Sequence, residues 1–326
     1  RFSLRVPAEG FERGIRLLAE NLLRPALPEA AFRTVRKQEA SAVAGEIGSP
    51  GYLSRRALRT ALYPKGDPTL RHATPETVSG LTLEDVRAYH DEVFRPDMTT
   101  IVVVGDVTAD RAKAVVGRYF GRWEAAGPKP ETDPPPVPPN APSRAEVPDA
   151  SRVQDEVTLA QTLGVTRAHP DYYALQVGTH VLAGAFYATR LYRDLRERTG
   201  LVYAVEAMLD AGKTRSSYAV FYGCDPANVS RARDIVERDL RDMQTTPVPA
   251  DELRRAKTLL VRKIPLSESS VDGIAGTLLD LSQKGLPLDE PLRAARRYRG
   301  VTAEQVRAAF RKWLRPADFV QVTMGP

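Results

Sequence analysis

The strongest constraint on this chain is a unit that its sequence contains twice. Gly80–Pro96 reads GLTLEDVRAYHDEVFRP, and Gly300–Pro316 reads GVTAEQVRAAFRKWLRP. The matching positions are all 220 residues apart, and the segments that follow, TTIVVVG and FVQVTMG, also correspond. Solenoid repeats recur about every 20 to 50 residues. The much longer offset therefore indicates a duplicated domain.

Each copy of this unit predicts the same local structure. Thr82 and Thr302 are suited to begin helices, because Asp85 and Gln305 follow three residues later in a capping-box pattern. Proline then ends each helix, since the residue before a proline avoids the helical region. The β-branched segment after the proline predicts a strand.

The repeat extends towards the start of the chain. RFSLRVP at 1–7 and SYAVFYG at 217–223 are both predicted to be strands. A helix is expected after each, and a second helix then begins at a proline in 27–32 and in 248–253. The order strand, helix, helix, irregular segment, helix, strand thus occurs twice.

A proline-rich stretch separates the two copies. Residues 127–148 contain nine prolines, which favour a stiff, extended spacer. We predict a first domain at 1–126, a linker at 127–144 and a second domain at 145–326. Because the second copy is longer than the first, we also expect the first domain to lack about 75 residues at its front.

Composition excludes several classes of protein. The net charge is +6, but lysine and arginine alternate with acidic residues and form no aromatic-flanked basic tract, which argues against nucleic-acid binding. No apolar run approaches the roughly 20 residues of a membrane span. Cys224 is the only cysteine, which excludes an intrachain disulfide and a cysteine-based zinc site.

The histidines show no catalytic or metal-binding spacing. No pair follows the His-x-x-x-His or His-x-x-Glu-His pattern, and the chain contains no Gly-x-Ser-x-Gly, P-loop or Gly-x-Gly-x-x-Gly motif. We therefore expect an ordinary surface or half-buried side chain at each histidine: His72, His90, His169 and His180.

The densest candidate for a functional site lies at 182–209, LAGAFYATRLYRDLRERTGLVYAVEAML. A helix is expected to end at Gly200, and a strand follows it. Arg196 lies in the last turn of that helix, and Tyr203 lies three residues beyond the glycine. Residue chemistry alone favours roles in the helix dipole and in strand packing.

Within this stretch, TRLYRDLRERTGLVYAV resembles the second-domain signature of the M16 metallopeptidases, the insulinase, pitrilysin and mitochondrial processing peptidase family. The order and spacing of the elements agree over nearly the whole chain. The resemblance implies an α+β fold of two tandem, duplicated domains. Each domain would have an antiparallel-rich sheet with helices packed on one face, and the first would be truncated at its N-terminus.

The resemblance also implies a role for two residues. In the family, an Arg and a Tyr seven residues apart in this signature bind the substrate peptide, and Arg196 and Tyr203 have that spacing. A guanidinium offers several donors to peptide carbonyls. A tyrosine hydroxyl can stabilise negative charge that develops on a scissile carbonyl.

The zinc ligands of the family are not matched here. Two His ligands and a catalytic Glu come from a His-x-x-Glu-His helix whose equivalent would precede residue 1. The third ligand is a Glu on a later helix, and that position falls on Ala42, which cannot bind a metal. Glu39 and Glu46 lie about one turn away. We therefore expect no catalytic residue, metal ligand or cofactor in this chain.

These expectations lead to one hypothesis and two alternatives. We predict a non-catalytic M16-type subunit that binds an extended peptide through Arg196 and Tyr203. It would complete the chamber of a homologous, zinc-bearing partner as a heterodimer, or else form a homodimer. One alternative is an active zinc endopeptidase with its His-x-x-Glu-His upstream and Glu39 or Glu46 as the third ligand. The other is a structural scaffold subunit without peptide processing. The compartment stays open between cell envelope and cytoplasm.

Overall fold

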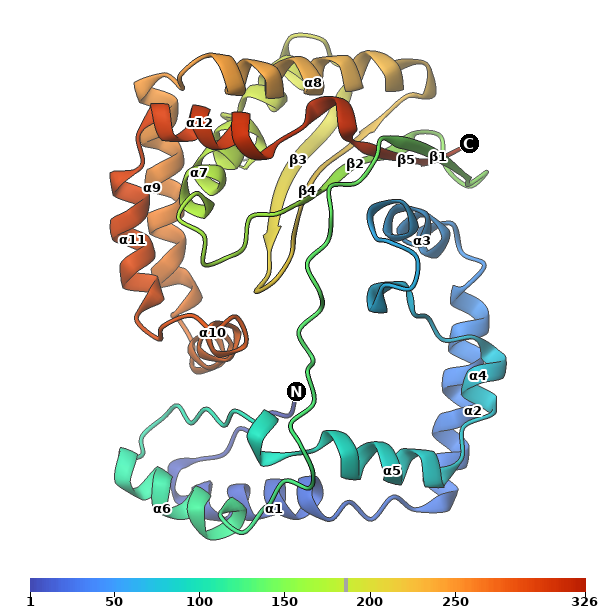
Figure 1. Cartoon of the computed structure of the whole chain (residues 1–326), viewed down its shortest axis with the longest axis vertical. Coiled ribbons are helices and arrows are strands. Elements are labelled where there is room, and N and C mark those ends of the chain that lie inside the picture. Colours follow the sequence, from blue (N-terminus) through green and yellow to red (C-terminus); the bar gives the residue numbers. More distant parts are fainter. Residues whose placement is uncertain (185–186) are drawn as a thin grey trace. The chain divides into compact units, whose positions relative to one another are not determined.

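The computed structural model describes residues 1–184 and 187–326, which form two compact units (Figure 1). Unit 1 comprises Arg1–Glu46, Ala73–Thr132 and Ser267–Ser282, and unit 2 comprises Ile47–His72, Asp133–Leu266 and Gln283–Pro326. These units are defined by contacts between segments and not by the repeat. The sequence domains 1–126 and 145–326 therefore remain a prediction. Ala185 and Phe186 of the candidate motif lie outside the described residues.

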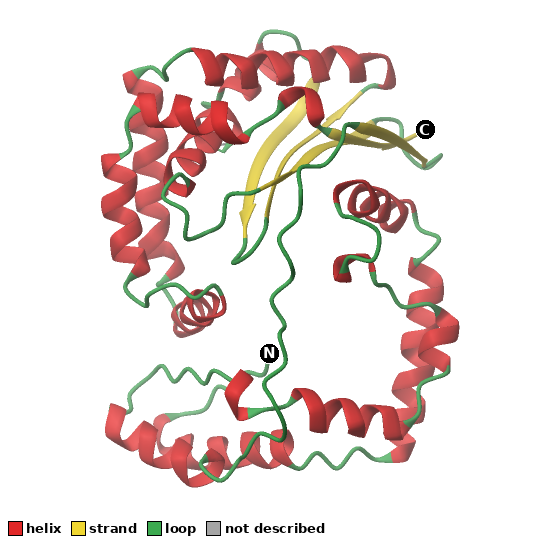
Figure 2. Ribbon diagram, viewed as in Figure 1, coloured by secondary structure: helices red, strands yellow, loops and turns green. Residues whose placement is uncertain are grey.

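Unit 2 is built on a five-stranded sheet with the order β1-β5-β2-β4-β3 (Figure 2). Its strands are β1 (Ser143–Pro148), β2 (Asp155–Leu163), β3 (Val202–Ala211), β4 (Ser216–Cys224) and β5 (Val320–Gly325). All neighbours are antiparallel except β1 and β5, which are parallel. Strand β1 was missed by the sequence reasoning, because it lies inside the proline-rich stretch. Its position at the edge of the sheet tolerates a proline, which cannot donate to a neighbour.

Helices cover both faces of this sheet. The helices of unit 2 are α3 (Pro50–Leu62), α7 (Tyr172–Ala183), α8 (Val229–Thr245), α9 (Ala250–Ser267), α11 (Glu290–Gly300) and α12 (Ala303–Trp313). Tyr218 and Phe310 are fully buried in the main core, on the side of α7, α8 and α12. Leu62 of α3 packs on the opposite face with Ala160 and Val322. The α+β class is confirmed. Helices were expected on one face of the sheet, and α3 also packs on the other.

Unit 1 contains helices and no strand among its described residues. Its helices are α1 (Phe11–Leu23), α2 (Glu29–Glu46), α4 (Pro75–Ser79), α5 (Leu83–Val93), α6 (Ala109–Phe120) and α10 (Val271–Gln283). Ile15 of α1 and Val115 of α6 are buried in a small core of their own. The apolar residues of α1 and α6 therefore mark the faces along which these helices pack.

The two strands predicted in the first copy are wrong. Residues 1–7 and 99–105 have no regular secondary structure, although their counterparts in the second copy are β4 and β5. Both β4 and β5 are hydrogen-bonded to β2. A strand requires the backbone donors and acceptors of a neighbouring strand, and the described residues of unit 1 contain no strand that could pair with residues 1–7 or 99–105.

Each copy of the repeat contributes one helix to the compact unit that is built mainly from the other copy. Helices α3 and α10 correspond in the repeat, and each has 13 residues. Helix α3 is part of unit 2, whereas α10 is part of unit 1, where Asp272 pairs with Arg5 and Ser282 contacts Thr100. The contact units are therefore discontinuous in sequence. No helix among the described residues is long and apolar enough to cross a membrane.

Candidate functional site

Arg196 is held by a short π-helical turn at Tyr192–Glu197. Leu191 and Leu195 anchor this turn, because both side chains are fully buried in the core of unit 2. Gly200 ends it with φ +63°, a left-handed conformation that is costly for other residues. The chain then enters β3, as the sequence predicted. Arg196 itself is exposed.

Tyr203 lies at the start of β3, the strand at the free edge of the sheet. The pairing of β3 with β4 shifts between Val202 and Val205, so that Tyr203 stands in an irregular part of the ladder. Its side chain is 74% exposed. An exposed aromatic ring at a strand that has no neighbour on one side is accessible to a second chain.

The structure brings the two predicted residues together. The Cζ atom of Arg196 lies 5.2 Å from the centroid of the Tyr203 ring, within the range of a cation–π contact. The same guanidinium donates to the carbonyl of Val202 at 3.4 Å. Arg196 and Tyr203 thus form one surface feature at the edge of the sheet.

A buried carboxylate next to this feature engages the neighbouring arginines. Asp194 accepts hydrogen bonds from Arg193 at 3.1 Å and from Arg198 at 3.2 Å, and it pairs with Arg238. Among the described residues, no carboxylate forms an ion pair with Arg196. Its guanidinium therefore keeps donors free for a ligand, whereas the arginines on either side stabilise the fold.

The pKa values of Asp239 and His180, both in unit 2, are strongly shifted from their ordinary values. Burial raises the pKa of Asp239 to about 6, although Arg238 donates to it. Burial, with the charge of Lys263, lowers the pKa of His180 to about 4. The His180 ring bonds the carbonyl of Gln176 at 3.2 Å and lies 3.4 Å from the amine of Lys263. These contacts account for His180 as a structural residue.

The other histidines also bond within the protein. The Nε2 atom of His90 donates to the carbonyl of Leu22 at 2.8 Å. The Nδ1 atom of His169 accepts from the backbone of Asp171 at 3.0 Å, and the Nδ1 atom of His72 lies 3.4 Å from the carbonyl of Leu70.

The residues present do not fit a zinc ion. Ala42, Glu39 and Glu46 lie on α2, and all three are exposed. Within residues 1–184 and 187–326, no three His, Cys, Asp or Glu side chains converge in a way that could hold a metal. An alanine offers no ligand atom, and a lone carboxylate does not make a site of the usual three or four ligands.

The sequence reasoning missed part of the site. It did not predict the shift in register at Tyr203 or the pairing of Asp194 with Arg238, which is 44 residues away. A shift in register depends on the neighbouring strand, and a contact at this separation leaves no periodic pattern. The resemblance of the stretch around Arg196 and Tyr203 to the family signature was the only available signal.

Comparisons with known proteins agree with this fold. The chain is 24% identical over 313 residues to a probable inactive metalloprotease of Bacillus subtilis. The matched region covers 89% of this chain and 70% of that protein. It is 25% identical over 209 residues to an uncharacterised zinc protease of Mycobacterium leprae, which covers 60% of this chain and 43% of the relative. This chain thus spans less than half the length of the Mycobacterium leprae relative.

Solved structures show the same architecture. A crystal structure of a peptidase M16 inactive domain from Pseudomonas fluorescens matches with a TM-score of 0.85 and 25% identity, over 98% of this chain and 76% of that chain. A protease from Helicobacter pylori matches with a TM-score of 0.83 and 17% identity, over 98% and 78%. The family model described as peptidase M16 inactive domain matches residues 80–260. This chain therefore belongs to the peptidase M16 inactive domain family.

Proposed function

We propose that this chain is a non-catalytic, peptide-binding subunit of an M16-type peptidase. The observation that carries the proposal is the pair of Arg196 and Tyr203, exposed together at the free edge of the sheet. An extended peptide can add to such an edge through backbone hydrogen bonds. The arginine and tyrosine would then contact its carbonyl groups.

The arrangement favours binding over chemistry. The guanidinium is already placed against the ring and the Val202 carbonyl, so a peptide would immobilise little additional freedom. An absence of converging His, Cys, Asp or Glu side chains among the described residues supports this proposal. In this proposal the zinc and its activated water belong to a homologous partner chain, in a heterodimer or, failing that, a homodimer.

The test is the binding of a fluorescent, extended peptide to the purified chain, measured by anisotropy. Arg196→Ala should weaken binding by about 1–3 kcal/mol, because a charge-assisted hydrogen bond is lost. Tyr203→Phe should weaken it less, since the ring and its cation–π contact remain. A peptide N-methylated at alternate residues should not bind, because it cannot pair with the edge.

Arg198→Ala is the matched control. Arg198 is an exposed arginine two residues away, but its guanidinium pairs with Asp194. Equal binding by the wild type, Arg196→Ala and Arg198→Ala would refute the proposal. The chain alone should also carry no stoichiometric zinc and cleave no peptide. Hydrolysis that a chelator abolishes would instead support the active-peptidase alternative.

A further inference from the structure

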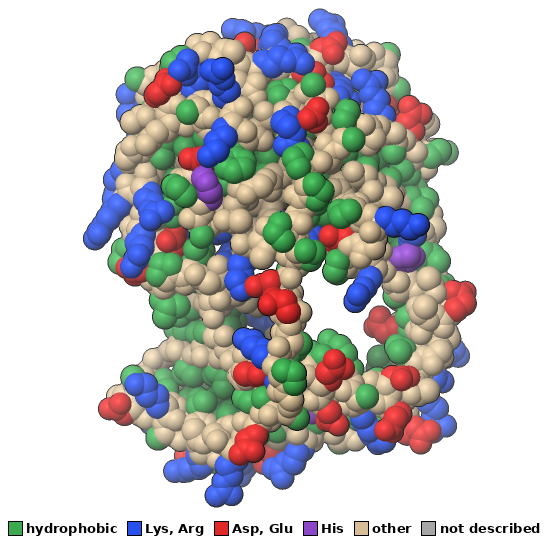
Figure 3. Space-filling view, viewed as in Figure 1, with side chains coloured by type: hydrophobic (Ala, Val, Ile, Leu, Met, Phe, Trp, Pro, Cys, Tyr) green, Lys and Arg blue, Asp and Glu red, His purple; other side chains and the backbone are tan. Residues whose placement is uncertain are grey.

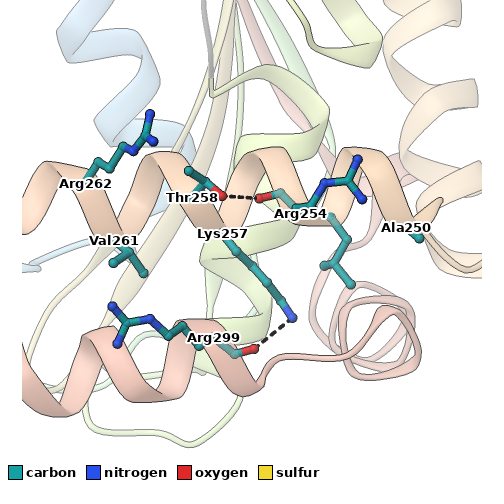
Figure 4. A pocket seen from close by; sticks show the side chains of 8 residues that line it. Ala250, Arg254, Lys257, Thr258, Val261, Arg262 and Arg299 are labelled. Carbon is teal, nitrogen blue, oxygen red and sulfur yellow. Dashed lines mark hydrogen bonds between the residues drawn. The ribbon is translucent and has the colours of Figure 1, made fainter.

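A groove between α9 and α11 in unit 2 is lined by several cations. Its volume is about 580 Å³, and its cations are Arg254, Lys257 and Arg262 of α9 and Arg299 of α11 (Figure 4). Within the described part of the chain, none of these four forms an ion pair with a carboxylate. Lysine and arginine side chains also gather over α9 and α11 in the space-filling view (Figure 3).

The acids of both helices are already engaged elsewhere. On α9, Asp251 pairs with Arg255 at 2.7 Å, and Glu252 pairs with Arg190 at 2.8 Å. At the start of α11, Glu290 pairs with Arg167 at 2.9 Å. The positive potential of the groove is therefore not cancelled by its own helices.

The floor of the groove is apolar. Leu253 and Val261 line it and are half-buried. Val261 points from α9 towards α11, on the same side as the stem of Lys257 (Figure 4). Lys257 donates to the backbone carbonyl of Arg299 at 3.0 Å and so connects the two helices across the groove. Burial lowers the pKa of Lys257.

The cations flank this apolar stripe along its length. Arg254 and Arg262 project from α9 away from α11, and the side chain of Arg299 rises from α11 (Figure 4). The lining residues of α9 run from Ala250 to Arg262, which corresponds to about 18 Å, or three helical turns. An apolar stripe with positive borders is complementary to a helix that has apolar residues on one face and acidic residues beside them.

We propose that the α9–α11 groove binds an acidic amphipathic helix of a partner protein. This site is separate from the edge of β3 and does not depend on the function proposed above. Charge complementarity selects the occupant: a basic or neutral helix would leave the cations unpaired, and a polar acidic segment would leave the floor uncovered.

The probe is a fluorescent 14-residue peptide with leucine at every third or fourth position and glutamate on both sides of the leucine stripe. The full 326-residue chain should bind it, and binding should weaken steeply with added salt. Two control peptides should not bind: one with glutamine in place of glutamate, and one with serine in place of leucine.

The variant pair Arg254→Ala with Arg299→Ala should weaken binding at least about tenfold, as expected for the loss of two charge-assisted contacts. The matched control is Arg255→Ala with Arg293→Ala, which removes one arginine from each of the same helices. Both control arginines already pair with acids, Asp251 and Asp289. Binding by this control should stay within about twofold of the wild type.

Several results would overturn the proposal. These are an absence of binding up to millimolar peptide, equal losses in the two double variants, or equal affinity for the serine-substituted peptide. Tighter and competing binding of duplex DNA or phosphatidylserine vesicles would assign the groove to another polyanion. Self-association that only Arg254→Ala with Arg299→Ala abolishes would assign it to a second copy. Circular dichroism of each variant separates these results from misfolding.

Discussion

The two copies of the repeated unit fold alike at their helices and differently at the segments that follow. Helices α5 and α12 each have 11 residues and begin with a complete capping box. The backbone of Thr82 donates to Asp85 at 2.8 Å, and that of Thr302 donates to Gln305 at 2.9 Å. Residues 99–105 then remain irregular, whereas Val320–Gly325 is the strand β5. Capping is decided within four residues, but a strand is decided by its neighbours.

The same helix also has a different energetic role in each copy. Helix α12 buries Val306, Ala309 and Phe310, whereas α5 has no fully buried residue. Phe310 packs so closely on α7 that a Cβ atom added at Gly178 would lie 2.2 Å from its ring. The corresponding position in the first copy, 220 residues earlier, is His90.

The largest effect is expected at this pair of positions. Phe310→Ala should lower the free energy of unfolding by about 3–5 kcal/mol, because it leaves a cavity in the main core. His90→Ala should lower it by about 1 kcal/mol, through the lost bond to the Leu22 carbonyl. Urea unfolding followed by circular dichroism measures both. Equal effects would show that the two copies contribute equally to stability.

Unit 2 also buries two titratable groups, Asp239 and His180, whose pKa values are shifted in opposite directions. In unit 2, Asp239 titrates near pH 6 and His180 near pH 4, against ordinary values of 3.8 and 6.5. Between pH 3.8 and 6, the folded protein binds more protons at Asp239 than the unfolded chain does, so this group lowers stability as the pH rises. At His180 the unfolded chain binds more protons between pH 4 and 6.5, so stability is lost as the pH falls.

Asp239→Asn should therefore separate the pH dependence of stability that comes from Asp239 from that which comes from His180. The variant should be more stable than the wild type at pH 7, by at most about 3 kcal/mol, with little difference at pH 4. Acidification from pH 7 to pH 4 should then destabilise the variant more than the wild type, because only His180 still titrates. Thermal unfolding at several pH values measures this, with Asp234→Asn, an exposed acid on the same helix, as control. Parallel pH profiles for Asp239→Asn and the wild type would contradict the assignment.

The smallest effect on stability is expected at the helix N-caps, which both copies share. Thr82→Ala and Thr302→Ala should each cost about 1 kcal/mol, since each removes the side chain that accepts from the third residue of its helix. Thr→Ser at the same positions is the control, because serine keeps the capping oxygen. Costs that differ by more than about twofold would show that tertiary packing, and not the local motif, sets the strength of the cap.

The sequence predicted only part of the helical structure, because the segments expected to be irregular contain α3 and α4 in the first copy and α10 and α11 in the second. The caps of α5 and α12 and the end of the π-helical turn at Gly200 follow from residues close in sequence. The strands β3, β4 and β5 were also predicted. Their counterparts at 1–7 and 99–105 have equally strand-like sequences but lack a paired neighbour, and β1 was missed because its proline is tolerated only at an edge.

The candidate site divides in the same way. The resemblance to the family signature, with its spacing of seven residues, predicted Arg196 and Tyr203 as a pair, and it placed the third metal-ligand position at Ala42. The sequence did not predict that the guanidinium would lie against the ring at a free sheet edge, or that Asp194 would occupy the other arginines. Those features depend on strand order and on contacts far apart in the chain.

The sequence by itself determined the caps of α5 and α12 and the end of the turn at Gly200. Its repeat and its resemblance to a known family predicted the duplication, the class of fold and the pair of Arg196 and Tyr203. Only the tertiary structure decided which strand-like segments became strands, which helix of each copy joined the other copy's unit, and which cations were left without acids in the α9–α11 groove. The physical reason is that caps and stripes are satisfied within one element. Strand pairing, burial and ion pairing require a partner that only the folded chain brings near.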